Sequence, residues 1–316
     1  MGAGTLTILA LAAVLALLPA AVDRWASRRG ASPQALIVLA SITLAGIGAL
    51  PVALIVCLSA RGIGRDRPLP GGLVVLLGLV LLAVLAGRAT ARTVIIRRRW
   101  RALAEIAHRL TPTGASSEVA VIPVSDLLAF AAGSQTFVSR GLLERLSPSE
   151  TLAVIEHERE HADHHHGRLL MAATAITHAS FNLAPARRAA QIITRELDVL
   201  ADRAAAHRLG DASAVQSALE TISGAGDPAD GTDPATLRRR LDRLGPAPGT
   251  SPLRAESGVR LATLAVSTGI LITICLSVHT TSLWLGIATC TLLVISLWAF
   301  VGPVVGPRAR RGAGSG

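Results

Sequence analysis

Lysine is absent from the 316-residue chain, so all 31 of its basic side chains are arginines. The 21 acidic residues leave a formal net charge of +10. A basic chain that binds nucleic acid gathers its positive charges on one polar face. Here the arginines instead flank apolar segments, which is typical of a membrane protein with arginine-rich cytoplasmic loops. The charge pattern favours a lipid bilayer as partner, and we expect no direct contact with nucleic acid.

Cysteine is also scarce. Cys57, Cys275 and Cys290 all lie inside long apolar segments, and no two of them form a CxxC pair. This placement excludes a disulfide framework. We expect the three thiols to pack among apolar side chains or to face lipid.

Apolar residues are abundant, at 51% of the chain with a mean hydropathy of +0.51. Such values are too high for a wholly soluble protein. A membrane-spanning helix needs about 20 mostly apolar residues. Five segments meet or nearly meet this length: 5–22, 35–60, 73–96, 261–278 and 283–305. The first has no basic segment before it and no clear cleavage site, so we expect it to be retained as a span.

The arginines also predict the orientation of these spans. Arginines follow the third span at positions 97–99 and 101, and the fifth at 308, 310 and 311, whereas the turn 279–282 has no formal charge. Arginine-rich loops stay in the cytoplasm. The connector with Arg61, Arg65 and Arg67 opposes this orientation, because it falls on the outer side.

The chain therefore divides into three parts in a multi-pass protein of the inner or plasma membrane. Residues 1–96 supply three transmembrane helices, and residues 259–316 supply two more with a short basic tail. Residues 97–258 form a domain that faces the cytoplasm, and their number is normal for one compact domain.

Short strands are expected early in this polar region. A helical stretch at 100–110 ends at a Thr-Pro-Thr-Gly sequence, and residues 118–124 are β-like. Residues 127–132 and 135–138 are short apolar segments separated by Gly-Ser, which predicts a hairpin.

A helix with a well-marked start follows the strands. Ser147 is suited to the N-cap, Pro148 to the first helical position, and Glu150 to the third residue of a capping box. Gly167 offers a natural stop for this helix. Residues 187–209 predict a second helix, and 235–244 a short basic one between the Gly/Pro-rich loops 224–234 and 245–252.

The first of these helices contains the pattern HExxH. His157 and His161 are four residues apart, so both imidazoles project from one helix face and can bind the same Zn²⁺. Glu158 then lies beside the open coordination position, where a carboxylate can act as general base. The pattern predicts a zinc metallopeptidase with Glu158 as its catalytic residue.

Zinc needs a third protein ligand. The metzincin continuation of HExxH fails, because His164 and Gly167 stand where that pattern requires glycine and histidine. A gluzincin instead takes a carboxylate from a later helix. Asp198 and Asp202 share one face of such a helix, so Asp198 would bind the metal and Asp202 would orient a ligand histidine.

Glu196 is the alternative third ligand. It lies two residues before Asp198, so the two side chains point about 200° apart on a helix and cannot both face one metal. Glutamate has the longer reach, but choosing it would turn Asp202 away. Ala201 and Ala205 would let this helix approach the HEREH helix closely, as the shorter aspartate requires.

Five further histidines have weaker cases. His164, His165 and His166 are expected to form a polar helix end, although a substitute ligand at His164 or His165 is geometrically possible. His178 and His207 are isolated, and either would be a candidate for stabilising an oxyanion.

Four phrases occur in a specific order: Leu-Leu-Ala-Phe-Ala at 127–131, Phe-Val-Ser-Arg-Gly-Leu-Leu at 137–143, the HEREH helix, and Ala-Asp-Arg-Ala-Ala at 201–205. Because of the order and spacing of these segments, residues 119–202 resemble the cytoplasmic peptidase of BlaR/MecR-type membrane metallopeptidases, which form the antirepressor family. They resemble the HtpX-type membrane proteases more distantly. In that family a glutamate four residues before the aspartate is the third ligand, and this chain has Asp198 there. Residues 233–244 also resemble the Pro-then-Arg helix of HtpX-type proteases.

The resemblance implies a mainly α-helical membrane protein with about five transmembrane helices and an α+β zincin-like domain inserted between the third and fourth. It implies a zinc-dependent endopeptidase whose protein substrate is a BlaI/MecI-like transcriptional repressor or the enzyme itself, acting in signal transduction. Only a short basic tail follows the fifth span, so we do not expect direct β-lactam sensing. HtpX-like quality control, or an inactive scaffold or sensor, are the alternatives. The sequence does not define the oligomeric state.

Overall fold

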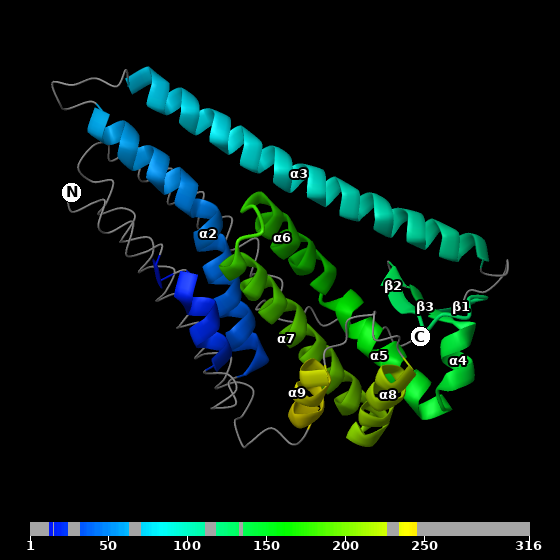
Figure 1. Ribbon diagram of the computed structural model, residues 1–316. Coiled ribbons are helices and arrows are strands. Elements are labelled where there is room, and N and C mark those ends of the chain that lie inside the picture. Colours follow the sequence, from blue (N-terminus) through cyan, green and yellow to red (C-terminus); the bar gives the residue numbers. More distant parts are fainter. Residues whose placement is uncertain are drawn as a thin grey trace, which may run out of the picture.

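The computed structural model describes residues 13–14, 16–24, 32–62, 71–110, 118–132, 135–225 and 234–244. These residues form mainly helices and one small sheet (Figure 1). In chain order the named elements are α2 (Pro33–Gly62), α3 (Gly71–Leu110), β1 (Val119–Ile122), β2 (Ala129–Ala132), β3 (Gln135–Ser139), α4 (Arg140–Arg145), α5 (Pro148–Asp163), α6 (His166–Ala179), α7 (Ala184–Leu209), α8 (Ala212–Ala225) and α9 (Pro234–Leu244).

The second and third predicted spans fall within α2 and α3. Among the described residues, no helix is both long and apolar enough to cross a membrane. The five-span topology therefore stays a prediction. Several predicted features lie outside the described residues: the spans at 261–278 and 283–305, Cys275, Cys290, the loop 245–252, the basic tail, and half of the first span.

The first half of α2 packs into the same core as α6 and α7. Leu36, Ile37 and Leu44 of α2 are almost fully buried, and they belong to one apolar cluster with Leu169 of α6 and Ile193 of α7. Figure 1 shows α2 running alongside α7. Apolar residues expected to lie in the membrane thus share a core with the region that carries HExxH.

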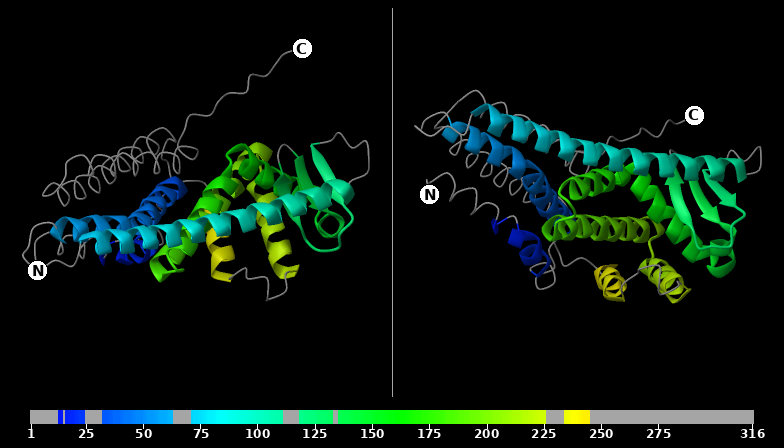
Figure 2. Two further views of the ribbon diagram at one scale, coloured as in Figure 1. Left: turned by 90° about the horizontal axis from the view of Figure 1, so that it is seen from above. Right: turned by 45° about the horizontal axis from the view of Figure 1, so that its top comes forward.

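Helix α3 connects this helical core to the sheet. It is 40 residues long, and the predicted domain boundary between residues 96 and 97 lies inside it. Near its C-terminal end, Ala107 packs against Phe130 and Phe137 of the sheet. The two views of Figure 2 show α3 extending from the end of α2 to the three strands.

The sheet has the strand order β1-β3-β2. The predicted hairpin is confirmed, because β2 pairs with β3 antiparallel, with Phe130 opposite Phe137. β1 pairs with β3 in parallel. β2 therefore lies at one edge of the sheet among the described residues, and α5 packs beside it.

Helix α5 begins as predicted. The Ser147 side chain accepts a hydrogen bond from the Glu150 N–H at 3.3 Å, and the Glu150 carboxylate accepts one from the Ser147 N–H at 2.7 Å. The predicted stop at Gly167 is wrong. The helix ends at Asp163, and His165 adopts a left-handed conformation with a φ of 53°, so α6 starts at His166 and includes Gly167. The turn needs no glycine because histidine tolerates this conformation better than most residues.

Helices α5 and α7 approach each other through small side chains. Ala153 of α5 and Ala205 of α7 are buried in one cluster with Val215 of α8. The close approach expected from Ala205 is therefore confirmed. Helix α7 ends at Gly210, which has a φ of 66° and serves as its C-cap.

Candidate metal centre

Helices α5 and α7 bring three candidate ligands together. One ligand atom from each of His157, His161 and Asp198 lies within 4.8 Å of the other two. The His157 and His161 Nε2 atoms are 3.1 Å apart, and the His161 Nε2 is 3.7 Å from the Asp198 Oδ1. Ligand atoms held about 2.0–2.1 Å from a tetrahedral zinc lie roughly 3.3–3.4 Å apart. The group therefore has the donor types and the size that a zinc site requires.

Asp202 contacts the ring nitrogen of His157 that faces away from the other candidate ligands. Its side chain is only 2% exposed, and its Oδ1 lies 2.8 Å from the His157 Nδ1. If Nδ1 donates this hydrogen bond, the Nε2 atom is left free for a metal. Burial alone would lower the pKa of His157, but the hydrogen bond and the charge of Asp202 raise it overall. Asp202 thus makes the contact predicted for it.

Arg240 fixes Asp202 in turn. Its Nε and Nη2 atoms donate to the two carboxylate oxygens of Asp202, each at 2.7 Å. Burial opposes the charged carboxylate, but the bonds from His157 and Arg240 lower the pKa of Asp202. Arg240 lies on α9, so this short basic helix completes a chain of contacts that ends at His157. The sequence predicted this helix, but only the family resemblance linked it to the site, because no spacing rule relates it to HExxH.

Glu196 is separated from the candidate ligands. Its side chain is 0% exposed and forms ion pairs with Arg195 and Arg243. The helix that brings Asp198 to the histidines therefore directs Glu196 into a separate set of buried arginine contacts. This arrangement agrees with the angular argument made from the sequence.

Glu158 lies beside the metal group and against the sheet. Its carboxylate accepts a hydrogen bond from the backbone N–H of Ala131 in β2. Burial raises the pKa of Glu158, and the nearby Asp198 raises it further. Burial likewise raises the pKa of Asp198. A glutamate with a raised pKa is suited to accept a proton and then to release it.

The three histidines after α5 are in different environments. His165 is exposed, and the His164 Nδ1 lies 3.0 Å from a carboxylate oxygen of Glu160. His166 is buried, with its Nδ1 3.0 Å from the Nδ1 of His161. The predicted polar helix end is therefore wrong for His166, because the left-handed turn at His165 directs the next side chain inward. No residue pattern in the sequence predicts this turn.

Burial lowers the pKa of both inner histidines. It brings His161 to a pKa of about 3, with a further contribution from the charge of His157. It brings the pKa of His166 to about 4, again with a contribution from a neighbouring histidine, His164. His178 and His207 are not among the residues grouped here. His178 lies in the last turn of α6, about 18 Å along the helix from His166.

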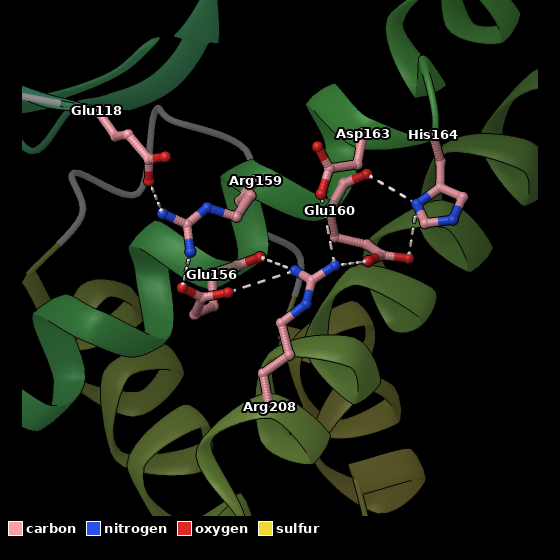
Figure 3. Close-up of polar contacts among 7 residues, drawn as sticks. All are labelled: Glu118, Glu156, Arg159, Glu160, Asp163, His164 and Arg208. Carbon is pink, nitrogen blue, oxygen red and sulfur yellow. Dashed lines mark hydrogen bonds and ion pairs between the residues drawn. The ribbon is translucent and has the colours of Figure 1, made fainter. Parts of the chain in front are cut away.

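An ionic network secures the opposite side of α5 (Figure 3). Arg208 of α7 donates to a carboxylate oxygen of Glu160 at 2.5 Å and to the backbone oxygen of Glu156 at 3.2 Å. Arg159 bridges Glu156 and Glu118, which ties α5 to the start of β1. Because these contacts join α5 to both α7 and the sheet, they fix the helix that carries both ligand histidines.

Residues 91–200 match the sequence model of Peptidase family M48. The match indicates a metallopeptidase. It begins inside α3 and includes His157, Glu158, His161 and Asp198, but it ends before Asp202 and α9. Peptidases of this family use zinc, which agrees with the donor set of the candidate centre. Comparisons with curated proteins and with solved structures gave no significant match.

Proposed function

We propose that this metallopeptidase is a membrane-bound zinc endopeptidase whose active site comprises His157, His161, Asp198 and Glu158. The single observation that carries the proposal is the convergence of two imidazoles and a carboxylate from α5 and α7. Glu158 lies next to that point, and Asp202 supports one of the ligands. The Oδ1 of Asp198 lies 3.7 Å from the Nε2 of His161, which is close enough for both atoms to bind one metal ion.

Each residue has a distinct task in the proposed reaction. Zinc bound by His157, His161 and Asp198 would polarise the scissile carbonyl and make a water molecule more acidic. Glu158 would accept the proton of the attacking water and pass it to the leaving amine, because its carboxylate lies beside the ligand group. Asp202 keeps His157 in the tautomer and orientation that present Nε2 to the site.

The substrate would lie along the outer edge of β2. The Ala131 N–H bonds to Glu158, which means that the edge of β2 turned away from β3 borders the site. An extended peptide adding to an exposed strand edge is held by main-chain hydrogen bonds, whatever its side chains. This mode suits an endopeptidase, because it places a backbone rather than a particular side chain beside Glu158.

We further propose that the physiological substrate is a BlaI/MecI-like repressor or the enzyme itself, cleaved in the cytoplasm near the membrane. The order of phrases in residues 119–202 and the predicted orientation of residues 97–258 support this role. Quality control of membrane proteins, as in HtpX-type proteases, is the second candidate. The contact of Arg240 with Asp202 favours it, because that helix is the part that resembles HtpX-type enzymes.

Cleavage by the full chain in detergent or vesicles tests the proposal. The wild-type protein should cleave an unstructured protein such as casein, should stop after treatment with a chelator, and should recover when zinc is added. Glu158→Gln should keep its zinc and lose cleavage, because the proton carrier is removed but no ligand is changed. A Glu158→Gln protein with wild-type cleavage would contradict the mechanism. Among candidate substrates, cleavage of a winged-helix repressor in preference to casein would favour the regulatory role.

A further inference from the structure

His166 is the buried imidazole that the proposed reaction does not use. It is 3% exposed, and its Nδ1 lies 3.0 Å from the Nδ1 of His161. The rings meet edge to face, with centroids 4.9 Å apart. The other nitrogen of His161, Nε2, points toward His157 and Asp198. His166 thus contacts the side of His161 that faces away from the candidate metal position.

The chemistry of a ligand imidazole fixes the direction of this hydrogen bond. An imidazole that gives its Nε2 lone pair to a metal carries its hydrogen on Nδ1. The Nδ1–H of His161 must then be the donor, and the Nδ1 of His166 must be the acceptor. This in turn places the hydrogen of a neutral His166 on its Nε2.

We propose that His166 is a positioning residue for the zinc site, which holds His161 through a neutral nitrogen acceptor. The proposal rests on the zinc ligands assigned under the proposed function. It makes the two histidine ligands unequal, because the Nδ1 of His157 bonds to the charged carboxylate of Asp202, whereas the Nδ1 of His161 bonds to an uncharged ring. A carboxylate partner increases the basicity of a ligand histidine more than a neutral partner does.

The local backbone explains how His166 reaches this position. Helix α5 ends two residues after His161, and the left-handed residue His165 reverses the chain so that α6 begins with His166. The first side chain of α6 is thereby directed back toward the last turn of α5. His164 and His165, which flank the same turn, do not contact His161 by a hydrogen bond: His164 bonds to Glu160, and His165 is exposed.

Zinc affinity in matched variants of the full chain tests the proposal. His166→Phe keeps a ring but has no acceptor, and His166→Asn keeps an acceptor oxygen close to the Nδ1 position. His165→Asn is the control at the exposed neighbour, because asparagine tolerates the left-handed conformation of that residue. Competition with a chromogenic chelator gives the dissociation constant for zinc, and the visible spectrum of the cobalt(II)-loaded protein reports the ligand geometry. We expect His166→Phe to weaken zinc binding by about 10- to 100-fold and to change the cobalt spectrum. His166→Asn should restore most of the affinity, and His165→Asn should match the wild type.

Two results would overturn the role of His166. One is wild-type zinc affinity and cobalt spectrum in His166→Phe. The other is an equal loss of affinity in His166→Phe and His166→Asn together with equally lowered melting temperatures, which would indicate a purely structural role. These failures differ from failure of the proposed function. If zinc affinity depends on the acceptor at position 166 but the wild type cleaves nothing, the peptidase assignment fails and the role of His166 stands.

Discussion

Asp198 and Glu196 are two residues apart on α7, and their surroundings differ. Asp198 is partly exposed and lies beside the two histidines, whereas Glu196 is fully buried between Arg195 and Arg243. A bound cation stabilises a carboxylate most when other ligand donors lie beside that carboxylate and it has no strong cationic partner already. A carboxylate that is already paired with two arginines contributes instead to the stability of the fold.

Substitutions at the two positions should therefore separate metal binding from stability. Asp198→Ala should weaken zinc binding by at least about 100-fold, more than the loss of a supporting contact causes. Glu196→Gln should leave zinc affinity close to that of the wild type and should lower the free energy of unfolding by about 1–3 kcal/mol, because it removes the buried negative charge that pairs with Arg195 and Arg243. Chelator competition and denaturant unfolding measure the two effects.

The opposite pattern would move the ligand assignment. If zinc affinity collapses in Glu196→Gln and survives in Asp198→Ala, Glu196 is the ligand and the register of α7 around residue 198 is wrong.

Side chains of the site could be predicted from the sequence where helix geometry alone determines which residues share a face. The spacing of His157 and His161, and the shared face of Asp198 and Asp202, need only 3.6 residues per turn. The role of His166 was missed because it depends on a left-handed turn at His165, which is a conformation that the sequence does not require. The pairing of Arg240 with Asp202 spans 38 residues, and no local rule predicts it.

At the scale of elements, the start of α5 is tied to α8 through Glu150. The Glu150 carboxylate accepts hydrogen bonds from the hydroxyls of Ser217 and Thr221, in addition to the Ser147 N–H. The bond from Ser217 and then those from Ser147 lower the pKa of Glu150 from 4.5 to about 2. Because the folded pKa lies below the unfolded one, the stabilisation is present above about pH 4.5 and is lost as the pH falls toward 2.

The stability of Glu150→Gln should therefore approach that of the wild type in acid. At pH 7 the variant should melt at a lower temperature than the wild type, and the difference should shrink between pH 5 and pH 3. Glu144→Gln, at an exposed position of α4, is the control and should show little difference at either pH. A difference in melting temperature between Glu150→Gln and the wild type that stays constant down to pH 3 would contradict the assigned contacts.

The network on the other side of α5 leads to a second prediction at this scale. Arg208→Ala removes one of the two partners of Glu160, whose side chain is 8% exposed, and the bond to the Glu156 backbone. We expect the free energy of unfolding to fall by about 1–3 kcal/mol, because a nearly buried carboxylate loses its charged arginine donor. Arg109→Ala breaks an exposed pair with Glu105 and should cost less than about 0.5 kcal/mol. Equal effects in the two variants would show that the network does not secure α5.

Elements with strong local signals could be predicted, and those without them could not. The capping box predicted the start of α5, and the alternation of short apolar segments predicted β2 and β3. Helix α6 was not predicted, because its first two residues, His166 and Gly167, resemble the end of a helix. Helix α8 is an exception, because it was not predicted although Asp211 caps its start by accepting a hydrogen bond from the Ser213 N–H at 2.7 Å.

At the scale of the whole molecule, the relation of the apolar helices to the peptidase region is the main result of the fold. Leu36, Ile37 and Leu44 of α2 pack against α6 and α7 instead of forming a separate layer. When a helix is apolar on all sides, its sequence does not show which side packs against the rest of the protein or which element it contacts. The contact of α2 with α6 and α7 could therefore not be predicted. The packing implies that a movement of α2 would also displace α7, the helix that carries Asp198.

The orientation of the chain remains open to a direct test. A reporter enzyme inserted near Gly226 or fused after Gly316 should report the cytoplasm, because arginines surround the third and fifth predicted spans. A reporter that is active only outside the cytoplasm when inserted near Gly226 would reverse the orientation and would exclude a cytoplasmic repressor as substrate.

Zinc K-edge X-ray absorption on the full chain, loaded with one equivalent of zinc, tests the central claim most directly. The structure predicts a first shell made only of nitrogen and oxygen atoms at about 2.0–2.1 Å, with scattering from two imidazole rings, supplied by His157 and His161. In Asp198→Ala the two imidazoles should remain, and the zinc should be lost at a much lower chelator concentration. A shell with three imidazoles would place a further histidine on the metal, and a chain that retains no zinc would contradict the account as a whole.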